Sequence, residues 1–467
     1  MAIFQDITVQ ERAQRDDQSR LHVIIVGAGL GGLGAAIAIL LAGHDVTVLE
    51  AASEIEEIGA GIQVLPNASR ILFSWGLREI LEPHATLPQK CNFWGWKGNH
   101  LSEMDFHAYA GVTKAPFWDF HRANLHTGLL KRATQLGAKV ITNAKVQNFT
   151  IGDDGASATV LLADGQAMSA DLVVGADGIN SKLREIFLGR EDPPIPTGDL
   201  AYRLLLNSKD IVTDPDLRHF VDNPQVNYWL GPDMHVVNYI LGGGELFNMV
   251  LLVPDNIPLG AANIIAGDAA EMRGHLRQWD PRLGKLATLC DSKSVLKWRL
   301  CIRPTLEPSW SDPSGAFTML GDAVHATLPY LASGAGMALE DGGVLGLCLS
   351  RITDNSPSSK RKALQVYEAC RRERTERVVQ RGSYNQRMYH LADGPEQEER
   401  DKKFKVFEEL DKEWLSQETP ALPQVQETGD DPFPWRYHGV ARWLLTYDMW
   451  RDVEEKWAAC ASPEIHS

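Results

Sequence analysis

The stretch HVIIVGAGLGGLGAAIAILLAGHDVTVLE, residues 22–50, constrains the fold of this chain more than any other. It predicts a buried strand, a glycine turn, an apolar helix and a second strand that ends on an acid. Gly27, Gly29 and Gly32 have the spacing G-x-G-x-x-G, which combines a tight turn, room for a pyrophosphate, and close packing of helix on strand. Glu50 follows Gly32 by eighteen residues, where a carboxylate can accept hydrogen bonds from a ribose. The pattern indicates a dinucleotide site; the alternative is an ordinary strand–helix–strand turn.

The composition narrows the class of protein. A chain of 467 residues exceeds one compact unit, so we expect two domains or three. Its 44% hydrophobic and 23% charged residues are typical of a globular protein with an ample core. The net charge of −15 argues against nucleic acid or an anionic membrane as a partner. A single arginine inside a pocket can still hold an anionic substrate.

The chain offers few signs of targeting or of metal binding. Its longest apolar run, residues 33–42, is too short to cross a bilayer, so we expect no membrane span. The polar N-terminus resembles neither a secretory signal nor a transit peptide. The six cysteines form no C-x-x-C pair, which favours free thiols and no metal site. These features predict a cytoplasmic protein.

The order of predicted elements indicates an interrupted α/β scaffold. Apolar spacing predicts helices at residues 69–81 and 121–136 and a strand at 139–151. From Tyr202 to about Pro254 short strands follow one another without helices, as in an inserted antiparallel sheet. From Glu340 on the pattern is helical. We expect solvated linkers at two polar or proline-rich stretches and a last helix after them, at residues 392–403, 417–435 and 440–457.

A second motif, DLVVGADGINSKLR, covers residues 171–184. It predicts a buried strand, a tight turn at Asp177 and Gly178, and the start of a helix with basic residues. A carboxylate in this position suits a place near phosphates or a nicotinamide. It equally suits a turn aspartate that caps the following helix. The residues alone leave both interpretations of Asp177 open.

A third motif, at residues 317–345, changes the predicted ligand. A strand leads to Gly321 and Asp322, whose carboxylate can bind the hydroxyl groups of a sugar-alcohol chain. Gly334, Ala335 and Gly336 then precede another helix, whose N–H groups can stabilise negative charge on a ring. Reduced flavin needs two such helix ends, one for the pyrophosphate and one for the ring, whereas nicotinamide needs only one. The motifs together favour FAD over NAD.

In order and spacing, the three motifs resemble those of the class A flavoprotein monooxygenases, the FAD-dependent aromatic hydroxylases. The resemblance covers about residues 20–390, and it is strongest to the salicylate hydroxylase-like branch of fungi. It implies an α/β fold: a Rossmann-like FAD-binding domain of the glutathione-reductase type, an inserted antiparallel β-sheet substrate domain, and C-terminal helices. The expected division has a discontinuous FAD domain, a substrate domain and a C-terminal extension, at residues 20–80, 100–198 and 300–390; 81–99 and 199–299; and 391–467.

The resemblance also implies which residues hold the cofactors. Asp177 is expected between FAD and NADH or NADPH, which is an external, transient electron donor because the chain has no second G-x-G-x-x-G unit. Pro329 is expected beside the flavin as a contact. The predicted FAD-binding residues are Gly27, Gly29, Gly32, Glu50, Gly61, Arg122, Asp322, Pro329, Gly334, Ala335 and Gly336.

Three residues of the inserted strands are candidates for the substrate site. The period of two places His235, Val237 and Tyr239 on one face of their strand. In related phenol hydroxylases an arginine and a tyrosine at the positions of Arg203 and Tyr239 hold the phenolate, and arginine suits an anion. The alternatives are a salt bridge at the domain junction for Arg203 and, as the favoured interpretation, a hydrogen-bonded structural histidine for His235. His325 is expected in the core.

The activity implied by the resemblance is hydroxylation of a phenolic ring. NAD(P)H reduces FAD, O2 adds to give the C4a-hydroperoxide, and its distal oxygen passes to the activated ring. Salicylate, converted to catechol with loss of CO2, or a related phenolic acid is the expected substrate of a monomer or homodimer. A polyketide phenol, an indole or an isoprenoid is the alternative substrate, a flavin dehydrogenase or epoxidase the alternative enzyme, and a non-catalytic dinucleotide-binding protein the alternative class.

Overall fold

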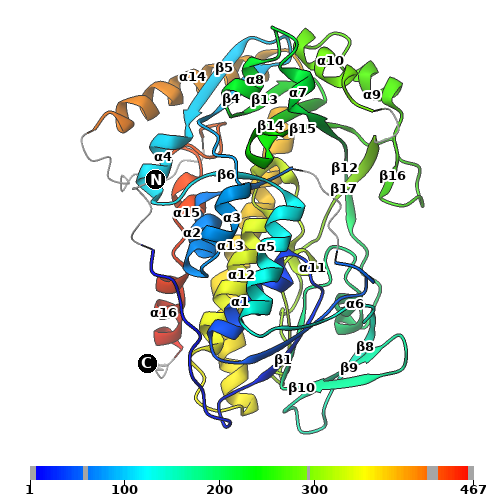
Figure 1. Ribbon diagram of the computed structural model, residues 1–467, viewed down its shortest axis with the longest axis vertical. Helices are drawn as coiled ribbons and strands as arrows, with labels where there is room; N and C mark the ends of the chain where they lie inside the picture. Colours follow the sequence, from blue (N-terminus) through cyan, green and yellow to red (C-terminus); the bar gives the residue numbers. More distant parts are fainter. Residues whose placement is uncertain (1–6, 56–60, 292–294, 418–429, 461–467) are drawn as a thin grey trace.

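The computed structural model describes residues 7–55, 61–291, 295–417 and 430–460. In Figure 1 a parallel sheet lies in the lower half and a larger, mainly antiparallel sheet in the upper half. Helices α12 (Gly334–Leu349) and α13 (Pro357–Tyr389) run between the two halves. The predicted combination of an α/β scaffold, an inserted antiparallel sheet and C-terminal helices is confirmed.

The five-stranded sheet is parallel throughout, with strand order β18-β11-β1-β2-β7. Its central strands are buried on both faces, which explains why their sequences are continuous apolar runs. The first motif forms β1, α1 and β2, and the second motif contributes β11. The bounds are His22–Val26 for β1, Asp45–Leu49 for β2, Lys139–Ile141 for β7, Leu172–Gly175 for β11 and Phe317–Met319 for β18.

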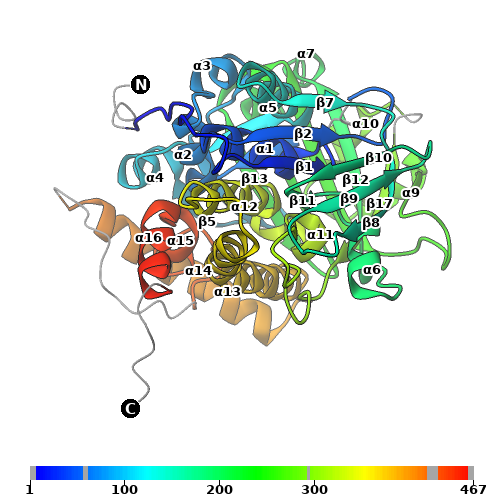
Figure 2. The ribbon, with the colours of Figure 1, turned by 90° about the horizontal axis from the view of Figure 1, so that it is seen from below.

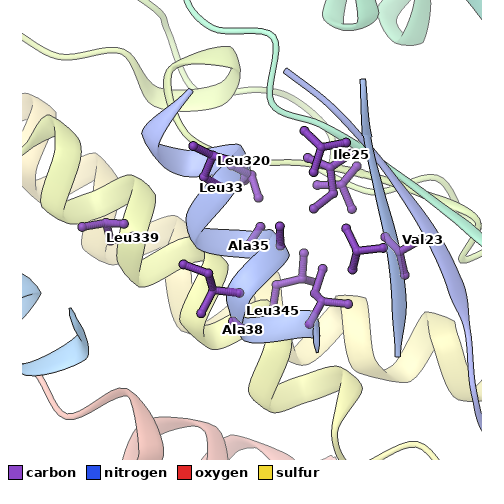
Figure 3. Packing of buried hydrophobic residues seen from close by; sticks show 14 of the residues in the cluster. Val23, Ile25, Leu33, Ala35, Ala38, Leu320, Leu339 and Leu345 are labelled. Carbon is purple, nitrogen blue, oxygen red and sulfur yellow. The ribbon is translucent and has the colours of Figure 1, made fainter. Parts of the chain in front are cut away.

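Helix α1 (Leu30–Leu41) lies between this sheet and α12, and it also contacts α5 (Arg122–Gln135). Figure 3 shows Leu33, Ala35 and Ala38 of α1 between the β1 and α12 side chains. The helix is buried on almost every side, so its sequence is apolar all round. Close approach requires small residues: a Cβ on Gly342 of α12 would lie 2.6 Å from the Ala35 nitrogen.

The three-stranded antiparallel sheet β10-β9-β8 packs beside the parallel sheet, where β10 contacts β1 and β9 contacts β11 (Figure 2). The predicted single strand at residues 139–151 is wrong, because the chain turns at Asn143, which has a φ of +54°. Its two halves join different sheets as β7 and β8. The bounds are Val146–Ile151 for β8, Ala158–Leu162 for β9 and Ala167–Ala170 for β10.

The eight-stranded sheet has the order β16-β17-β12-β15-β14-β13-β4-β5, antiparallel except for the β4–β13 pair. The predicted boundary between residues 99 and 100 is wrong, because it separates β4 from β5, which form a hairpin in this sheet. The bounds are Lys90–Gly95 (β4), His100–Asp105 (β5), Ile195–Asn207 (β12), Gln225–Gly231 (β13), Met234–Leu241 (β14), Leu246–Pro254 (β15), Ile264–Ala266 (β16) and Leu296–Ile302 (β17).

Two short strands, β3 (Gly61–Val64) and β6 (Trp118–His121), pair at the boundary between the two large sheets. The predicted helix at residues 69–81 is two helices, α2 (Pro66–Ser74) and α3 (Arg78–Leu81), interrupted by Gly76 at a φ of +76°. The remaining short helices are α4 (Phe106–Thr113), α6 (Lys182–Leu188), α7 (Ser208–Ile211), α8 (His219–Asp222), α9 (Ala269–His275), α10 (Pro281–Thr288) and α11 (Asp322–His325).

The C-terminal part differs most from expectation. The predicted linker at residues 392–403 is the start of helix α14 (Pro395–Leu415), which packs against β5. Of the second predicted linker, residues 418–429 lie outside the described residues, whereas Phe433 and Trp435 are fully buried. The last predicted helix is divided into α15 (Ala441–Leu445) and α16 (Met449–Ala459).

Within the described ranges, no helix is long and apolar enough to span a membrane. In the same part of the chain, no group of three or more histidine, cysteine or acidic side chains is arranged to hold a metal ion. The six cysteines are free thiols, and all except Cys460 are buried.

Candidate cofactor and substrate site

A cavity of about 830 Å³ lies where the parallel sheet faces the eight-stranded sheet. One wall follows the carboxyl ends of β1, β11 and β18, which is where open α/β sheets bind ligands. The opposite wall comes from β12, β14, β15 and β17. The cavity thus lies between all three predicted cofactor motifs and the predicted substrate strands.

The glycine turn has the geometry that its spacing predicts. Gly27 has a φ of +110°, and a Cβ there would lie 2.3 Å from the Ala176 carbonyl oxygen. A Cβ on Gly32 would lie 2.0 Å from the Gly27 oxygen, so helix and turn are in direct contact. Gly29, in contrast, lines the cavity, with no atom within 4 Å of a Cβ built there. As the N-cap of α1 it leaves the first N–H groups of the helix without a side-chain cap.

Glu50 directly follows β2, and its side chain stabilises this turn. Its carboxylate accepts hydrogen bonds from the Ala28 and Ala52 N–H groups, each at 2.9 Å. The contact with Ala28 links the acid directly to the glycine turn. Binding of a ribose by Glu50 stays a prediction.

The third motif brings two cavity-lining groups together. Asp322 follows Gly321, which has a φ of +64°, and lines the cavity at the start of α11. Gly334 and Ala335 line it at the start of α12, where no side chain caps the helix. Pro329 lies between these two elements on the same wall. Gly336 instead packs on α2, 3.5 Å from the Ala68 Cβ when a Cβ is built on it.

A buried ion network holds the Gly321 turn on α12. Asp341 of α12 accepts hydrogen bonds from the Gly321 N–H at 2.9 Å and from His325 Nε2 at 2.6 Å, and it pairs with Arg371 of α13 at 2.8 Å. Burial alone would raise the pKa of the Asp341 carboxyl, but His325 and Arg371 outweigh burial and lower it to about 2. His325 is buried, so its predicted place in the core is confirmed.

Asp177 has the geometry of a helix cap. Its carboxylate accepts hydrogen bonds from Ser181 Oγ at 2.6 Å and from the Lys182 and Leu183 N–H groups at 2.8 and 3.1 Å. Burial raises the pKa of Asp177, and these hydrogen bonds lower it in part. The following residues, 178–180, line the cavity in its place. Contact of Asp177 with NAD(P)H stays a prediction.

The substrate strands place the predicted residues on the cavity wall. His235, Val237 and Tyr239 of β14 all line it, as the period of two predicts. Arg203 of β12 lines it as well, with its guanidinium 4.5 Å above the Trp298 ring. Arg203 Nε is buried without a hydrogen-bond partner, and no carboxylate in the described part of the chain pairs with this side chain. The described residues therefore do not support the alternative prediction, in which Arg203 forms a salt bridge at the domain junction.

Electrostatics single out the same wall. Burial lowers the pKa of Arg203, and the nearby Tyr239 hydroxyl partly offsets this. Burial also raises the pKa of Tyr239, which keeps the phenol protonated at neutral pH. A half-buried cation beside a neutral hydroxyl is suited to an anionic oxygen of a ligand.

Comparisons with known proteins agree with this geometry. The family described as FAD binding domain matches residues 20–256. The FAD-dependent monooxygenase OpS4 of Beauveria bassiana is 40% identical over 421 residues, 89% of this chain and 94% of the relative. The 3-hydroxybenzoate 6-hydroxylase of Polaromonas naphthalenivorans is 33% identical over 380 residues, 80% and 90% of the two chains. The chain belongs to the FAD-dependent aromatic hydroxylases.

The comparison with solved structures shows a shared fold over most of the chain. A solved salicylate hydroxylase substrate complex has a TM-score of 0.73 at 21% identity, and the match covers 96% of this chain and 99% of that chain. FAD fits the residues present, because the space beside Gly29 is open and two uncapped helix ends face one cavity. The N–H groups at Gly29 would hold the pyrophosphate, Asp322 the ribityl chain, and the start of α12 the ring.

The other predicted contacts of the hydroxylase lie where its two sheets meet. Arg122, the first residue of α5, lines the cavity, as does Gly61 of β3. The Gly61 N–H donates a 3.0 Å hydrogen bond to Asn248 Oδ1 of β15. A Cβ on Gly61 would lie 2.6 Å from the Tyr239 ring. Gly61 therefore lies against the substrate wall, and its contact with FAD stays a prediction.

Sequence reasoning missed several residues of the cavity region. Gln63 lines the cavity and donates a 3.1 Å hydrogen bond to Asp119 Oδ1, and burial raises the pKa of this carboxyl well above its usual range. Tyr330 and Trp298 line the cavity too. His390 contacts His235 from the end of α13. The position of Tyr330 next to Pro329 was a usable signal, whereas the others depend on pairings between distant segments.

Proposed function

We propose that the hydroxylase uses NADH or NADPH, O2 and FAD to hydroxylate a phenolic acid, with salicylate as the first candidate. The observation that carries this proposal is Arg203, a cation on the cavity wall without a carboxylate partner among the described residues. A half-buried charge of this kind on a cavity wall is stabilised when a ligand supplies the opposite charge. The 3-hydroxybenzoate specificity in the name of one relative supports a carboxylated phenol.

The chain's own residues would bind, orient and activate the substrate. Arg203 would hold its carboxylate or phenolate, and the Tyr239 hydroxyl would donate a hydrogen bond to the same oxygen. The apolar residues Val237, Val250 and Leu252 would exclude water from the ring. Bound FAD supplies electrons from NAD(P)H and the activation of O2. A cation near the phenolic oxygen favours the phenolate, which is the more reactive form of the ring.

A second candidate substrate is a larger neutral phenol, such as a polyketide phenol, or an indole or isoprenoid. The apolar wall of β14 and β15 favours it, as does the 40% identity to a monooxygenase whose name specifies no benzoate. The two candidates differ in charge. Arg203 is essential only if the substrate is an anion.

The decisive experiment compares salicylate with methyl salicylate in phenol-stimulated oxidation of NADH and NADPH, with products identified by mass. Arg203→Met should raise the KM for salicylate about 10- to 100-fold, because a charge-assisted hydrogen bond contributes about 1.5–3 kcal/mol. The KM for methyl salicylate should change little if Arg203 holds the carboxylate, and should rise as well if Arg203 holds the phenolate. The KM of Arg203→Lys for salicylate should lie between those of Arg203→Met and the unmodified hydroxylase. Equal KM values for salicylate in Arg203→Met and the unmodified hydroxylase would exclude Arg203 from substrate binding.

A further inference from the structure

One row of residues crosses the eight-stranded sheet from the substrate wall to the edge of the sheet. Strand pairing aligns one residue from each of β14, β15, β12, β17 and β16. In that order they are His235, Leu252, Ala201, Trp298 and Ile264, and all five line the cavity. The first three are each 1% exposed, Trp298 is half-buried, and Ile264 on the edge strand is 39% exposed. The row therefore leads from the buried part of the cavity to the protein surface.

The outer part of this row is an apolar strip, which consists of Leu252, Ala201, Trp298 and Ile264. The neighbouring row carries the charge, because Arg203 lies two residues beyond Ala201 on the same face of β12. The Arg203 guanidinium lies 4.5 Å above the Trp298 ring, so the charge and the strip are in contact. Toward the edge of the sheet Arg203 is followed by Leu296, which lies outside the cavity lining. The apolar strip, and not the row of Arg203, therefore continues to the surface.

The loop between β15 and β16 adds apolar groups where the strip reaches the surface. Residues 261–263 of this loop line the cavity, and Leu259 near its tip is 98% exposed. Arg299 of β17 holds the base of the loop. Its Nε donates a 2.6 Å hydrogen bond to Asp255 Oδ2, and its backbone N–H donates one of 2.7 Å to the Asn263 carbonyl. Apolar side chains that stay exposed beside a cavity mouth are typical of a surface that binds an apolar ligand.

We propose that the substrate is a phenolic acid that carries an apolar arm, such as an alkyl or prenyl chain. Its anionic group pairs with Arg203, and its arm lies along the apolar strip toward Ile264. This inference rests on the proposed function and narrows its substrate class. Because Arg203 and the strip meet at Trp298, a single ligand occupies both when an anionic ring and an apolar chain are covalently joined.

The geometry of the sheet sets the length of this arm. Neighbouring strands are about 4.8 Å apart, so the two spacings from Ala201 to Ile264 span about 10 Å. An extended chain of about eight carbon atoms has this length, since carbon–carbon bonds measure about 1.5 Å. A shorter arm does not reach Ile264, and a longer arm ends in water. The affinity should therefore rise with chain length and then level off.

The test measures binding separately from turnover. Salicylates with straight alkyl chains of about one to ten carbons at ring position 4, 5 or 6 are titrated into the FAD-loaded protein without NAD(P)H, in a calorimeter. In the series that aligns with the strip, the dissociation constant should fall about twofold per methylene. This is about half the energy of full burial, because the strip covers one side of the chain. The fall should end near about eight carbons, and the heat-capacity change of binding should become more negative along the series.

The variant Ile264→Thr tests the outer end of the strip. It replaces an ethyl group by a hydroxyl but keeps the branched Cβ that suits a strand. The dissociation constant should rise about threefold for chains of about six to eight carbons, and change little for salicylate, which does not reach Ile264. The matched control is Ile195→Thr, at an isoleucine of β12 that is 48% exposed and lies outside the cavity lining. This control should leave the binding of every chain length unchanged.

A dissociation constant that stays flat or rises with chain length in all the series would overturn this inference. An Ile264→Thr variant that weakens short and long chains equally, or weakens none of them, contradicts it as well. A strip that serves NAD(P)H instead would raise the KM for NAD(P)H in this variant and leave the chain-length dependence unchanged, which also contradicts the proposal. Failure of the proposed function would appear differently, as absence of hydroxylated product from salicylate and from every homologue, whatever their affinities.

Discussion

Single buried polar side chains hold the cofactor-binding half together. His44, in the turn between α1 and β2, is fully buried. Its Nδ1 accepts the Leu21 N–H at 3.1 Å, and its Nε2 lies 3.1 Å from the Leu349 carbonyl oxygen. These partners require the neutral ring with its proton on Nε2. One tautomer thus ties the start of β1 to the end of α12, opposite the cavity.

The first prediction concerns the pH dependence of stability. Burial lowers the pKa of His44 to about 4, and the charge of Arg15 acts in the same direction. Because the folded-state pKa lies below the unfolded value of about 6.5, the stabilisation is complete above pH 6.5 and is lost as pH falls toward 4. Between pH 6.5 and pH 5 this loss is about 2 kcal/mol.

The measurement is urea unfolding of the unmodified protein and of His44→Asn at both pH values. The asparagine Oδ1 can accept the Leu21 N–H without titrating, so the variant should lose about 2 kcal/mol less on acidification. The difference between the two proteins isolates His44, because burial also lowers the pKa of His235 and His390. Equal losses on acidification would mean that His44 already carries a proton in the fold.

The roles of single residues were predictable from the sequence where the backbone geometry allows only one arrangement. Gly27, Gly29 and Gly32 have distinct steric roles, and each role follows from the spacing of the turn. The alternation along β14 likewise placed His235 and Tyr239 on the cavity wall. Asp177 and His390 could not be assigned in this way, because a cap and a lone histidine have no spacing that distinguishes their partners.

At the scale of elements, the contact between α1 and α12 positions both uncapped helix ends. A Cβ on Gly346 of α12 would lie 2.6 Å from the Ala38 Cβ and 2.7 Å from its carbonyl carbon. No flexible side chain can move aside here, so Gly346→Ala must push the helices apart. We predict a loss of about 1–3 kcal/mol in the free energy of unfolding, and weaker retention of FAD.

The matched control is Gly284→Ala in α10, where nothing lies within 4 Å of the added Cβ. This change should raise stability by about 0.5–1 kcal/mol, since alanine favours the helix. Thermal unfolding and the FAD content of the purified variants check both expectations. Equal stability of the two variants would show that the helices separate without penalty.

The type of an element was predictable where a clear apolar pattern extended over the whole element, as in α1 and in the strands of the eight-stranded sheet. Helix α14 was missed because its residues are mostly charged and only a few, such as Phe404 and Trp414, are buried. A polar composition predicts solvent, but a single buried stripe is enough to hold a helix on β5. The partner that selects this stripe lies about three hundred residues earlier in the chain.

At the scale of the whole molecule, the C-terminal segment, residues 430–440, packs against the substrate half and covers part of its hydrophobic core. Phe433 packs 4.5 Å from the Phe93 ring of β4, and Trp435 lies 6.1 Å from Phe106 of α4. Asp431 and Arg436 form a fully buried ion pair, with nitrogen–oxygen distances of 2.8 and 2.9 Å. Residues that the sequence places far from the substrate strands thus complete their hydrophobic core.

The Arg436 guanidinium also donates hydrogen bonds to Ser102 Oγ of β5 and to the Phe404 carbonyl of α14, at 2.8 and 3.1 Å. Removing one partner of such a pair leaves the other charge buried. We predict that Arg436→Met lowers the free energy of unfolding by about 3–5 kcal/mol. The double variant Asp431→Asn, Arg436→Met should recover part of this loss, because no charge remains.

Urea unfolding of the two single variants and the double variant gives the coupling energy of the pair. Burial already raises the pKa of Asp431, and Arg436 partly opposes this shift. Without the arginine the pKa rises further, so the stability of Arg436→Met should fall more steeply as pH increases toward 7. Arg451→Met, which breaks an exposed pair with Glu455, should change the midpoint far less. If the two arginine variants lose similar stability, the C-terminal segment does not depend on this ion pair, and packing of Phe433 and Trp435 alone holds it on the substrate sheet.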